Sequence, residues 1–104
     1  MIKTETIGCV KAATHILGDK WTPQLLRFFV NEDSVRFCQI QDLVEGINPR
    51  TLSARLDNLE TEGIIEKVIA PDKARCEYRL TEKGKALTPI LHDMQLWSDK
   101  FAAE

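Results

Sequence analysis

Apolar residues recur at helical spacing in the first third of the chain and predict two helices. The first covers residues 9–17 and has a natural stop in Gly18. The second covers about residues 21–30 and carries Pro23 in its first turn, the part of a helix that accepts proline. The apolar positions that define them are Cys9, Ala13, Ile16 and Leu17 in the first helix and Trp21, Leu25, Phe28 and Phe29 in the second.

A polar break at residues 31–34 separates these helices from a short third one. The pattern places this third helix over about residues 38–44, with Gly46 closing it. Its apolar side chains, which we expect to face the core, are Ile40, Leu43 and Val44.

The fourth predicted helix has the most informative pattern. It begins with an Asn48 cap and Pro49 at the first helical position, and it ends at Gly63. One side is a narrow stripe of three leucines, whereas the other carries small and hydrogen-bonding side chains in its first two turns. A merely solvated helix usually shows longer Glu and Lys there. The inward stripe is Leu52, Leu56 and Leu59, and the outward face comprises Arg50, Thr51, Ser53, Ala54, Asp57, Asn58 and Thr61.

Two extended runs follow and predict a β-hairpin. Residues 64–70 are rich in β-branched side chains, and residues 75–80 alternate between charged and apolar positions. Residues 71–74 join the two runs as a charged tip. The apolar positions of the second run are Cys76, Tyr78 and Leu80.

The last predicted helix starts at a Thr81 cap and reaches about Phe101, with a bend at Pro89. Its apolar side is longer than a monomer of 104 residues readily covers. We therefore expect a homodimer built on the last helix and the first. The expected interface includes Leu87, Leu91, Met94, Trp97 and Phe101, and Ile90 lies on the same side.

The order of elements predicts a mainly α fold with a small β-hairpin wing (α+β), that is, a winged helix-turn-helix with extra N- and C-terminal dimerisation helices. In a helix-turn-helix the second helix enters the major groove of DNA. We expect one domain over residues 1–104, with a DNA-binding core at about 36–80 and dimerisation helices at about 9–18 and 82–102.

The predicted partner is therefore double-stranded DNA, read as an inverted repeat. Arg50 is suited to a guanine edge or a phosphate, because its guanidinium offers paired donors. Lys73 and Arg75 at the hairpin tip suit phosphates, which position a protein without reading sequence. The full set of expected contacts is Arg36, Asn48, Pro49, Arg50, Thr51, Ser53, Ala54, Arg55, Lys73 and Arg75.

The overall charge counts against this prediction, because the formal net charge is −2 and the pI is about 5.7. A docking face can nevertheless be basic on an acidic molecule. Acids and bases nearly balance over residues 48–76, which leaves open a winged-helix module that binds another protein and no DNA. The acids gather late in the fourth helix, away from its first turns, and that arrangement favours DNA.

Other classes of function lack their signatures. The sequence has no Gly-rich phosphate loop, nucleophile elbow or metal-ligand spacing around His15 and His92, so we expect neither an enzyme nor a metal or cofactor. Its three cysteines are widely spaced, which suits a reducing compartment. No apolar run is long enough to span a membrane and no signal peptide opens the chain, so we expect a cytoplasmic location.

Six short segments, taken in chain order, resemble the HxlR-type regulators, a winged-helix group related to the MarR type. Each is weakly specific alone, but together they span nearly the whole chain. The resemblance implies homodimeric DNA-binding repressors or activators whose first and last helices make the dimer contacts. The segments are Cys9, ILGDKW at 16–21, RF at 36–37, INPRTL at 47–52, LETEGII at 59–65 and EYRLTEKG at 77–84.

Some members of this family use the matching cysteine to sense oxidants or electrophiles, which makes Cys9 a possible redox sensor. A thiol at a helix N-terminus also has its thiolate favoured by the helix dipole. The alternative is that Cys9 packs beside Ala13 and Ile16 as a small apolar residue. Cys38 is a second candidate at another helix start, and Cys76 is expected to pack in the wing.

A small-molecule effector is not identified by the sequence. Five aromatic residues are candidates for lining an effector pocket between dimer helices, although packing in the core and the dimer is the simpler explanation. They are Trp21, Phe28, Phe29, Trp97 and Phe101.

Overall fold

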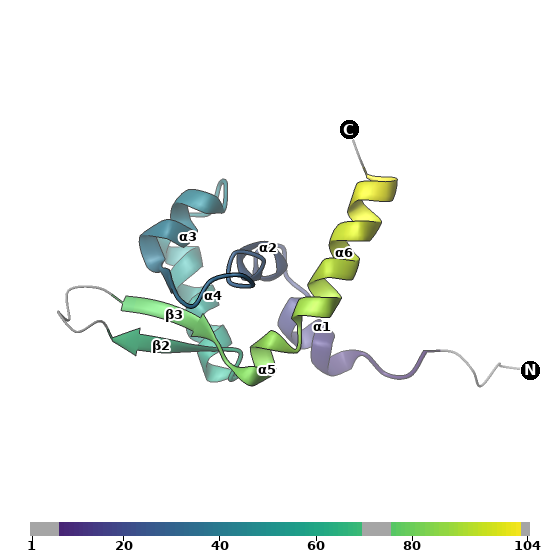
Figure 1. The fold of residues 1–104 in the computed structure, drawn as a ribbon, viewed down its shortest axis with the longest axis horizontal. Coiled ribbons are helices and arrows are strands. Elements are labelled where there is room, and N and C mark those ends of the chain that lie inside the picture. The colour runs from purple at the N-terminus through teal and green to yellow at the C-terminus, as the bar shows by residue number, and fades with distance from the viewer. Residues whose placement is uncertain (1–6, 70–75, 103–104) are drawn as a thin grey trace, which may run out of the picture.

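A small antiparallel sheet lies at one end of a cluster of helices, and the last helix and the extended segment ahead of the first helix leave the cluster at the other end (Figure 1). The computed structural model describes residues 7–69 and 76–102. Its elements are α1 (Lys11–Leu17), α2 (Thr22–Leu26), β1 (Val35–Arg36), α3 (Phe37–Leu43), α4 (Pro49–Thr61), β2 (Ile65–Ile69), β3 (Cys76–Leu80), α5 (Glu82–Lys85) and α6 (Thr88–Phe101).

The strands lie in the spatial order β1-β3-β2, and both neighbouring pairs are antiparallel. The predicted hairpin is confirmed as β2 and β3, with Ile65 opposite Leu80 at its base. The pattern does not predict β1, in which Val35 lies opposite Tyr78, because a strand of two residues shows no alternation. Tyr78 and Val35 are both buried, so this face of the sheet covers the core.

Apolar side chains from α1 through β3 meet in one core. The inward stripe predicted on α4 is confirmed, since all three of its leucines are fully buried. Burying a leucine side chain stabilises a fold by about 1.5–3 kcal/mol, so this stripe fixes which face of α4 points outward. The core residues are Ile16, Leu25, Leu26, Phe29, Val35, Ile40, Val44, Ile47, Leu52, Leu56, Leu59, Ile64, Ile65 and Tyr78.

Local signals set both ends of α4. The Asn48 side chain accepts a hydrogen bond from the Thr51 N–H at 2.8 Å, as expected of an N-cap. Gly63 ends the helix in the left-handed region, with φ of +78°, where glycine is favoured. Gly46 makes the turn before the helix in the same way, with φ of +87°. Together α3, this turn, α4 and the β2-β3 hairpin form a winged helix-turn-helix.

The second helix is shorter than the pattern predicts. It ends at Leu26 and not near residue 30, and residues 27–31 form successive turns. The N–H of Phe28 donates to Leu25 O and that of Phe29 to Leu26 O, at 3.2 and 3.0 Å. These bonds link residues three apart and tighten the chain, which turns it toward β1.

The prediction that Leu43 faces the core is wrong, because its side chain is 51% exposed. At 100° per residue Leu43 lies about 60° from Ile40 around the helix. The short α3 covers the core with only a narrow stripe, which Ile40 and the following Val44 fill.

The last predicted helix is two helices. The Thr81 hydroxyl accepts from the Gly84 N–H and caps only the short α5, after which the chain turns at Leu87. Pro89 lies in the first turn of α6, where its missing N–H costs nothing, and does not bend a continuous helix.

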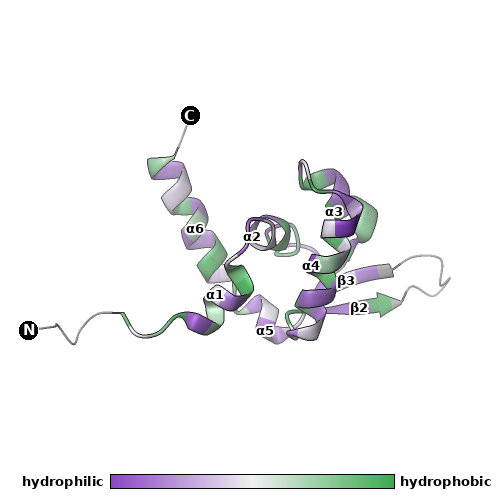
Figure 2. Ribbon diagram, turned by 180° about the vertical axis from the view of Figure 1, so that it is seen from behind, coloured by the Kyte–Doolittle hydropathy of each residue, from purple (hydrophilic) through white to green (hydrophobic). Residues whose placement is uncertain are grey.

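The α6 arm stands clear of the other helices along most of its length, as Figure 2 shows from behind. None of its residues is buried. The radius of gyration is 15.6 Å, compared with about 13 Å for a compact domain of this length. Within the described ranges no helix is both long and apolar enough to cross a membrane.

Candidate DNA-binding surface

The outward face of α4 presents short side chains and one arginine to solvent. Arg50, Ser53 and Ala54 are all exposed in the first two turns. The Arg50 guanidinium forms no hydrogen bond or ion pair with residues 7–69 or 76–102. Its five N–H donors are therefore directed to solvent or to a ligand.

The residues around the start of α4 shape its first turn. Asn48 and Pro49 are exposed, and Thr51 is half-buried, with its N–H held by the Asn48 side chain. The N-terminus of a helix carries partial positive charge, which attracts phosphate groups. The cap, the free arginine and the small outer side chains thus occupy one end of α4.

Arg55 does not join this face. Its side chain lies on the inner flank of α4, where the guanidinium is 3.8 Å from a carboxylate oxygen of Asp19. Both side chains are about one-third exposed. The arginine therefore connects α4 to the start of α2, and a separate contact with DNA stays a prediction.

Asp19 is a site residue that the sequence patterns did not identify. Its carboxylate accepts hydrogen bonds from the Trp21 and Thr22 N–H groups, at 2.9 and 3.0 Å, and from the Thr22 hydroxyl. Partial burial acts to raise the pKa of Asp19, but these hydrogen bonds and the charge of Arg55 outweigh it and lower the pKa below its ordinary value. The ILGDKW segment contained the residue, but its partner is 36 positions away.

Arg36 lies on β1, opposite Glu77 in the half of β3 that is nearer the tip of the wing, and not on α4. Its guanidinium is 3.9 Å from Glu77 of β3, and the side chain is about two-fifths exposed. The Ser34 hydroxyl donates a hydrogen bond to the same glutamate. Arg36 is therefore loosely held at the edge of the sheet, where an exposed guanidinium can still contact a phosphate.

The other end of α4 is acidic. Asp57 and Glu60 are exposed there, whereas Glu62 is 3.1 Å from His15 Nε2. On the wing, Glu66 is paired with Arg79 at 2.6 Å. The uncompensated positive charge of α4 thus lies at its first turns, as the pattern indicated. The predicted phosphate contacts Lys73 and Arg75 lie outside the described residues.

The predicted interface residues on the arm divide into two groups. Leu87 and Leu91 pack partly against the core of their own chain. Met94, Trp97 and Phe101 are exposed, the last two by 62% and 63%. The rings of Trp97 and Phe101 stack in a tilted arrangement, with centroids 5.3 Å apart.

The first helix starts at Lys11, so Cys9 precedes it and does not open it. Cys9 is exposed, and its sulfur lies 3.4 Å from the Lys11 backbone nitrogen, which donates a hydrogen bond to it. The interpretation of Cys9 as packed beside Ala13 and Ile16 is therefore wrong within this chain. Cys38 is also exposed, on the first turn of α3, and the side chain of Cys76 lies outside the described residues.

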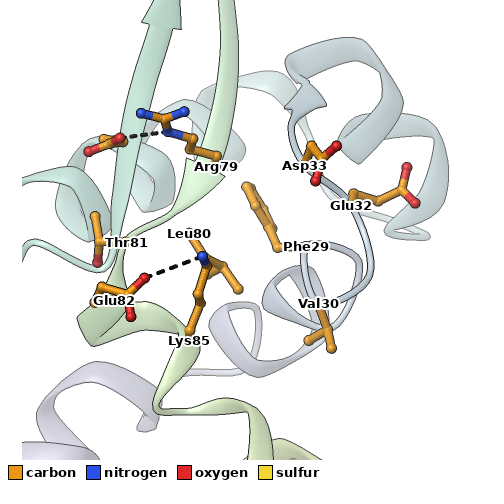
Figure 3. A pocket seen from close by; sticks show the side chains of 10 residues that line it. Phe29, Val30, Glu32, Asp33, Arg79, Leu80, Thr81, Glu82 and Lys85 are labelled. Carbon is orange, nitrogen blue, oxygen red and sulfur yellow. Dashed lines mark hydrogen bonds and ion pairs between the residues drawn. The ribbon is translucent and has the colours of Figure 1, made fainter.

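The chain has a surface hollow of about 520 Å³ between the wing base, α5 and the turn after α2 (Figure 3). Its lining is mostly charged, and Glu82 pairs there with Lys85 at 3.3 Å. Phe29 is its one aromatic residue, so the hollow is not the predicted aromatic pocket. The part of the chain that the structure describes contains no group of three or more His, Cys, Asp or Glu placed to hold a metal ion.

The sequence profile described as HxlR-like helix-turn-helix matches residues 16–104. This chain belongs to that family. It is a transcriptional regulator of the helix-turn-helix type, and the family consists of regulators and not enzymes.

Individual relatives agree with this membership. The HTH-type transcriptional regulator YvaP of Bacillus subtilis is 35% identical over 97% of this chain and 94% of its own. The reduced form of YodB from B. subtilis is 32% identical, with a TM-score of 0.77 over 91% of this chain and 95% of that one. YodB has also been solved diamide-treated and quinone-bound. The redox regulator HypR, in its oxidised form, superposes with a TM-score of 0.82 at 28% identity, over 88% of this chain and 94% of that one.

Proposed function

We propose that this regulator is a homodimer that binds an inverted repeat in double-stranded DNA and responds to oxidants or electrophiles through Cys9. The observation that carries the DNA-binding part is the outward face of α4. Three buried leucines fix the orientation of that face, and the Asn48 cap and the free Arg50 lie at its N-terminal end.

Docking of α4 follows from the size and chemistry of this face. The major groove is about 12 Å wide and admits a helix, and side chains as small as Ser53 and Ala54 allow the backbone to come close to base edges. Arg50 then reaches guanine or a phosphate with paired donors. Asp57 and Glu60 lie at the far end of the helix, which favours entry by the first turns.

The dimer is supported by the uncovered arm. Ile90, Met94, Trp97 and Phe101 recur at helical spacing and are all more than two-fifths exposed. Ile7 and Val10 ahead of α1 are exposed as well. A monomeric protein seldom leaves so many large apolar side chains in water, so a second copy is the natural cover.

A two-fold dimer presents two copies of α4, and this makes the expected operator a pseudo-palindrome. Half-sites are expected about one helical turn of DNA apart, roughly 34–36 Å, or at a multiple of it. Wing contacts by Lys73 and Arg75 would add affinity that does not depend on sequence.

The thiol response is supported by the surroundings of Cys9. The sulfur is exposed, so a reagent reaches it, and it accepts a hydrogen bond from the Lys11 backbone N–H at the start of α1. The relatives YodB and HypR were studied as reduced, oxidised or quinone-bound regulators, which matches this class of effector.

Selection from a random duplex pool tests the proposal. We expect enrichment of a palindrome whose affinity exceeds that of random duplex by at least about 10³-fold and falls steeply with salt. A pool that stays random, with no salt-dependent binding, would favour the alternative of a winged-helix module that binds protein.

A further inference from the structure

Residues 62–64, which we call the joint, connect the end of α4 to the start of β2 and are bound by side chains from both ends of the chain. His15 of α1 hydrogen-bonds the Glu62 carboxylate at 3.1 Å, and Lys83 of α5 donates to the Glu62 carbonyl at 2.8 Å. The Thr81 hydroxyl lies 2.5 and 3.1 Å from the carbonyl oxygens of residues 63 and 64.

The backbone of α5 also lies directly against the joint. The Thr81 N–H donates to the Ile64 carbonyl at 3.0 Å. Gly84 is buried, and a Cβ at that position would lie only 2.1 Å from the same Ile64 oxygen. This contact holds α5, and therefore the start of α6, against the point where α4, the proposed recognition helix, is followed by the wing.

We infer that the joint sets the angle of α1 and α6 relative to α4 and the wing, and that His15, Glu62 and Lys83 are positioning residues for DNA binding. The inference rests on the proposed dimer. Because α4 and β2 flank the joint directly, a change in the direction of α1 or α5 is delivered to the helix that reads DNA. In a dimer held by α1 and α6, this angle sets the separation of the two α4 helices.

The bonds at the joint are suited to orientation more than to stability. His15 is 66% exposed, and an exposed side-chain contact of this kind contributes little to the free energy of folding. Apart from this bond, α1 is anchored mainly by the apolar Ile16 and Leu17, and apolar contacts are not directional. Removing the His15 bond should therefore change the direction of α1 while leaving the core intact.

The joint also gives the Cys9 segment a route to α4. Cys9 precedes α1 by two residues, and His15 lies in the last turn of that seven-residue helix. If a modified thiol displaces the N-terminal segment, the displacement is therefore transmitted to α4 through one short helix, α1.

The test measures the distance between the two recognition helices directly. A spin label is placed at Asp57→Cys, on the exposed side of α4, in full-length protein whose native cysteines are serine. The parent is compared with the double variant His15→Ala/Lys83→Met. The matched control is His92→Ala/Lys85→Met, which removes the same two residue types from exposed positions of α6 and α5. Thermal unfolding checks that all three proteins fold.

We expect the double variant to broaden or shift the distance distribution, whereas the control reproduces the parent. Affinity for the operator selected by the parent should fall at least about fivefold, and discrimination against operators with one or two inserted base pairs should weaken. A double variant with the distribution and spacing preference of the parent would overturn the role of the joint while leaving the proposed function intact. If the parent shows no measurable spin-label distance between protomers, the proposed dimer is wrong, and so is the role of the joint.

Discussion

Asp19 and Arg55 join the start of α2 to the middle of α4 through an ion pair of 3.8 Å, on the side of the recognition helix that faces away from its exposed arginine. The same carboxylate holds the Trp21 and Thr22 N–H groups, which a helix start would otherwise leave without partners. One side chain thus both begins a helix of the core and restrains α4, the proposed recognition helix.

We expect Asp19→Ala to destabilise the fold by about 1–2 kcal/mol at pH 7, the usual cost of losing a side chain that satisfies a helix start. The pKa of Asp19 is lowered in the folded chain, so its charge contributes stability above pH about 4 and loses it as the pH falls through the folded value. The difference in the free energy of unfolding between wild type and variant should therefore be smaller in acid. Urea unfolding at pH 7 and pH 3 measures it, with the exposed Glu45→Ala as control. A difference independent of pH would contradict the role of the charge.

Substitution of Gly84 tests the close approach of α5 to the wing. In Gly84→Ala the new Cβ meets the Ile64 carbonyl at 2.1 Å and Leu80 Cδ2 at 2.9 Å, so backbone must move. Overpacking of this kind costs about 1–3 kcal/mol, which outweighs the roughly 1 kcal/mol that alanine gains over glycine in a helix. Gly8→Ala is the control, because nothing lies within 4 Å of its Cβ. Equal unfolding midpoints for the two variants would show that α5 is not packed as described.

The elements that could be predicted from the sequence are those with local determinants. For α4 the cap, the proline, the leucine stripe and the closing glycine all lie within 16 residues of one another. The strand β1 exists only because β3 pairs with it, and the packing of Gly84 of α5 against the Ile64 carbonyl brings together residues 20 positions apart. Arg50 could be identified from its own helix, whereas Asp19 and His15 act through partners 36 and 47 residues away. Local patterns carry no information about such partners.

Arg50 and the wing tip should differ in how they affect DNA binding. Arg50→Ala is expected to weaken the selected operator by about 1–3 kcal/mol if the side chain contacts a base, and to change random duplex less. Lys73→Ala should weaken both duplexes alike and flatten the salt dependence. Fluorescence anisotropy with the two duplexes at several salt concentrations separates these effects. Indistinguishable losses for the two variants would reject this division of roles.

The dimer is tested by placing a charge in the exposed stripe of the arm. Trp97→Glu should give a monomer at micromolar concentration, because removing a buried interface tryptophan costs about 2 kcal/mol or more and the charge opposes burial. Gln95→Glu adds the same side chain elsewhere on α6 and should leave the dimer intact. Sedimentation velocity distinguishes the two species. A wild-type chain that sediments as a monomer would rule the dimer out.

The last prediction concerns Cys9. Diamide or a quinone should change the operator affinity of the wild type by at least about fivefold, because modification of the exposed sulfur breaks its contact with the Lys11 N–H and displaces the segment ahead of α1. The change requires only that reduced and modified dimers bind DNA differently. Cys9→Ser should bind like the reduced wild type and ignore the reagent, whereas Cys38→Ser should respond as the wild type does. Anisotropy titrations of the three proteins, each reduced and treated, measure this directly. A response that survives Cys9→Ser and disappears in Cys38→Ser would move the sensing thiol to α3, where Cys38 is also exposed.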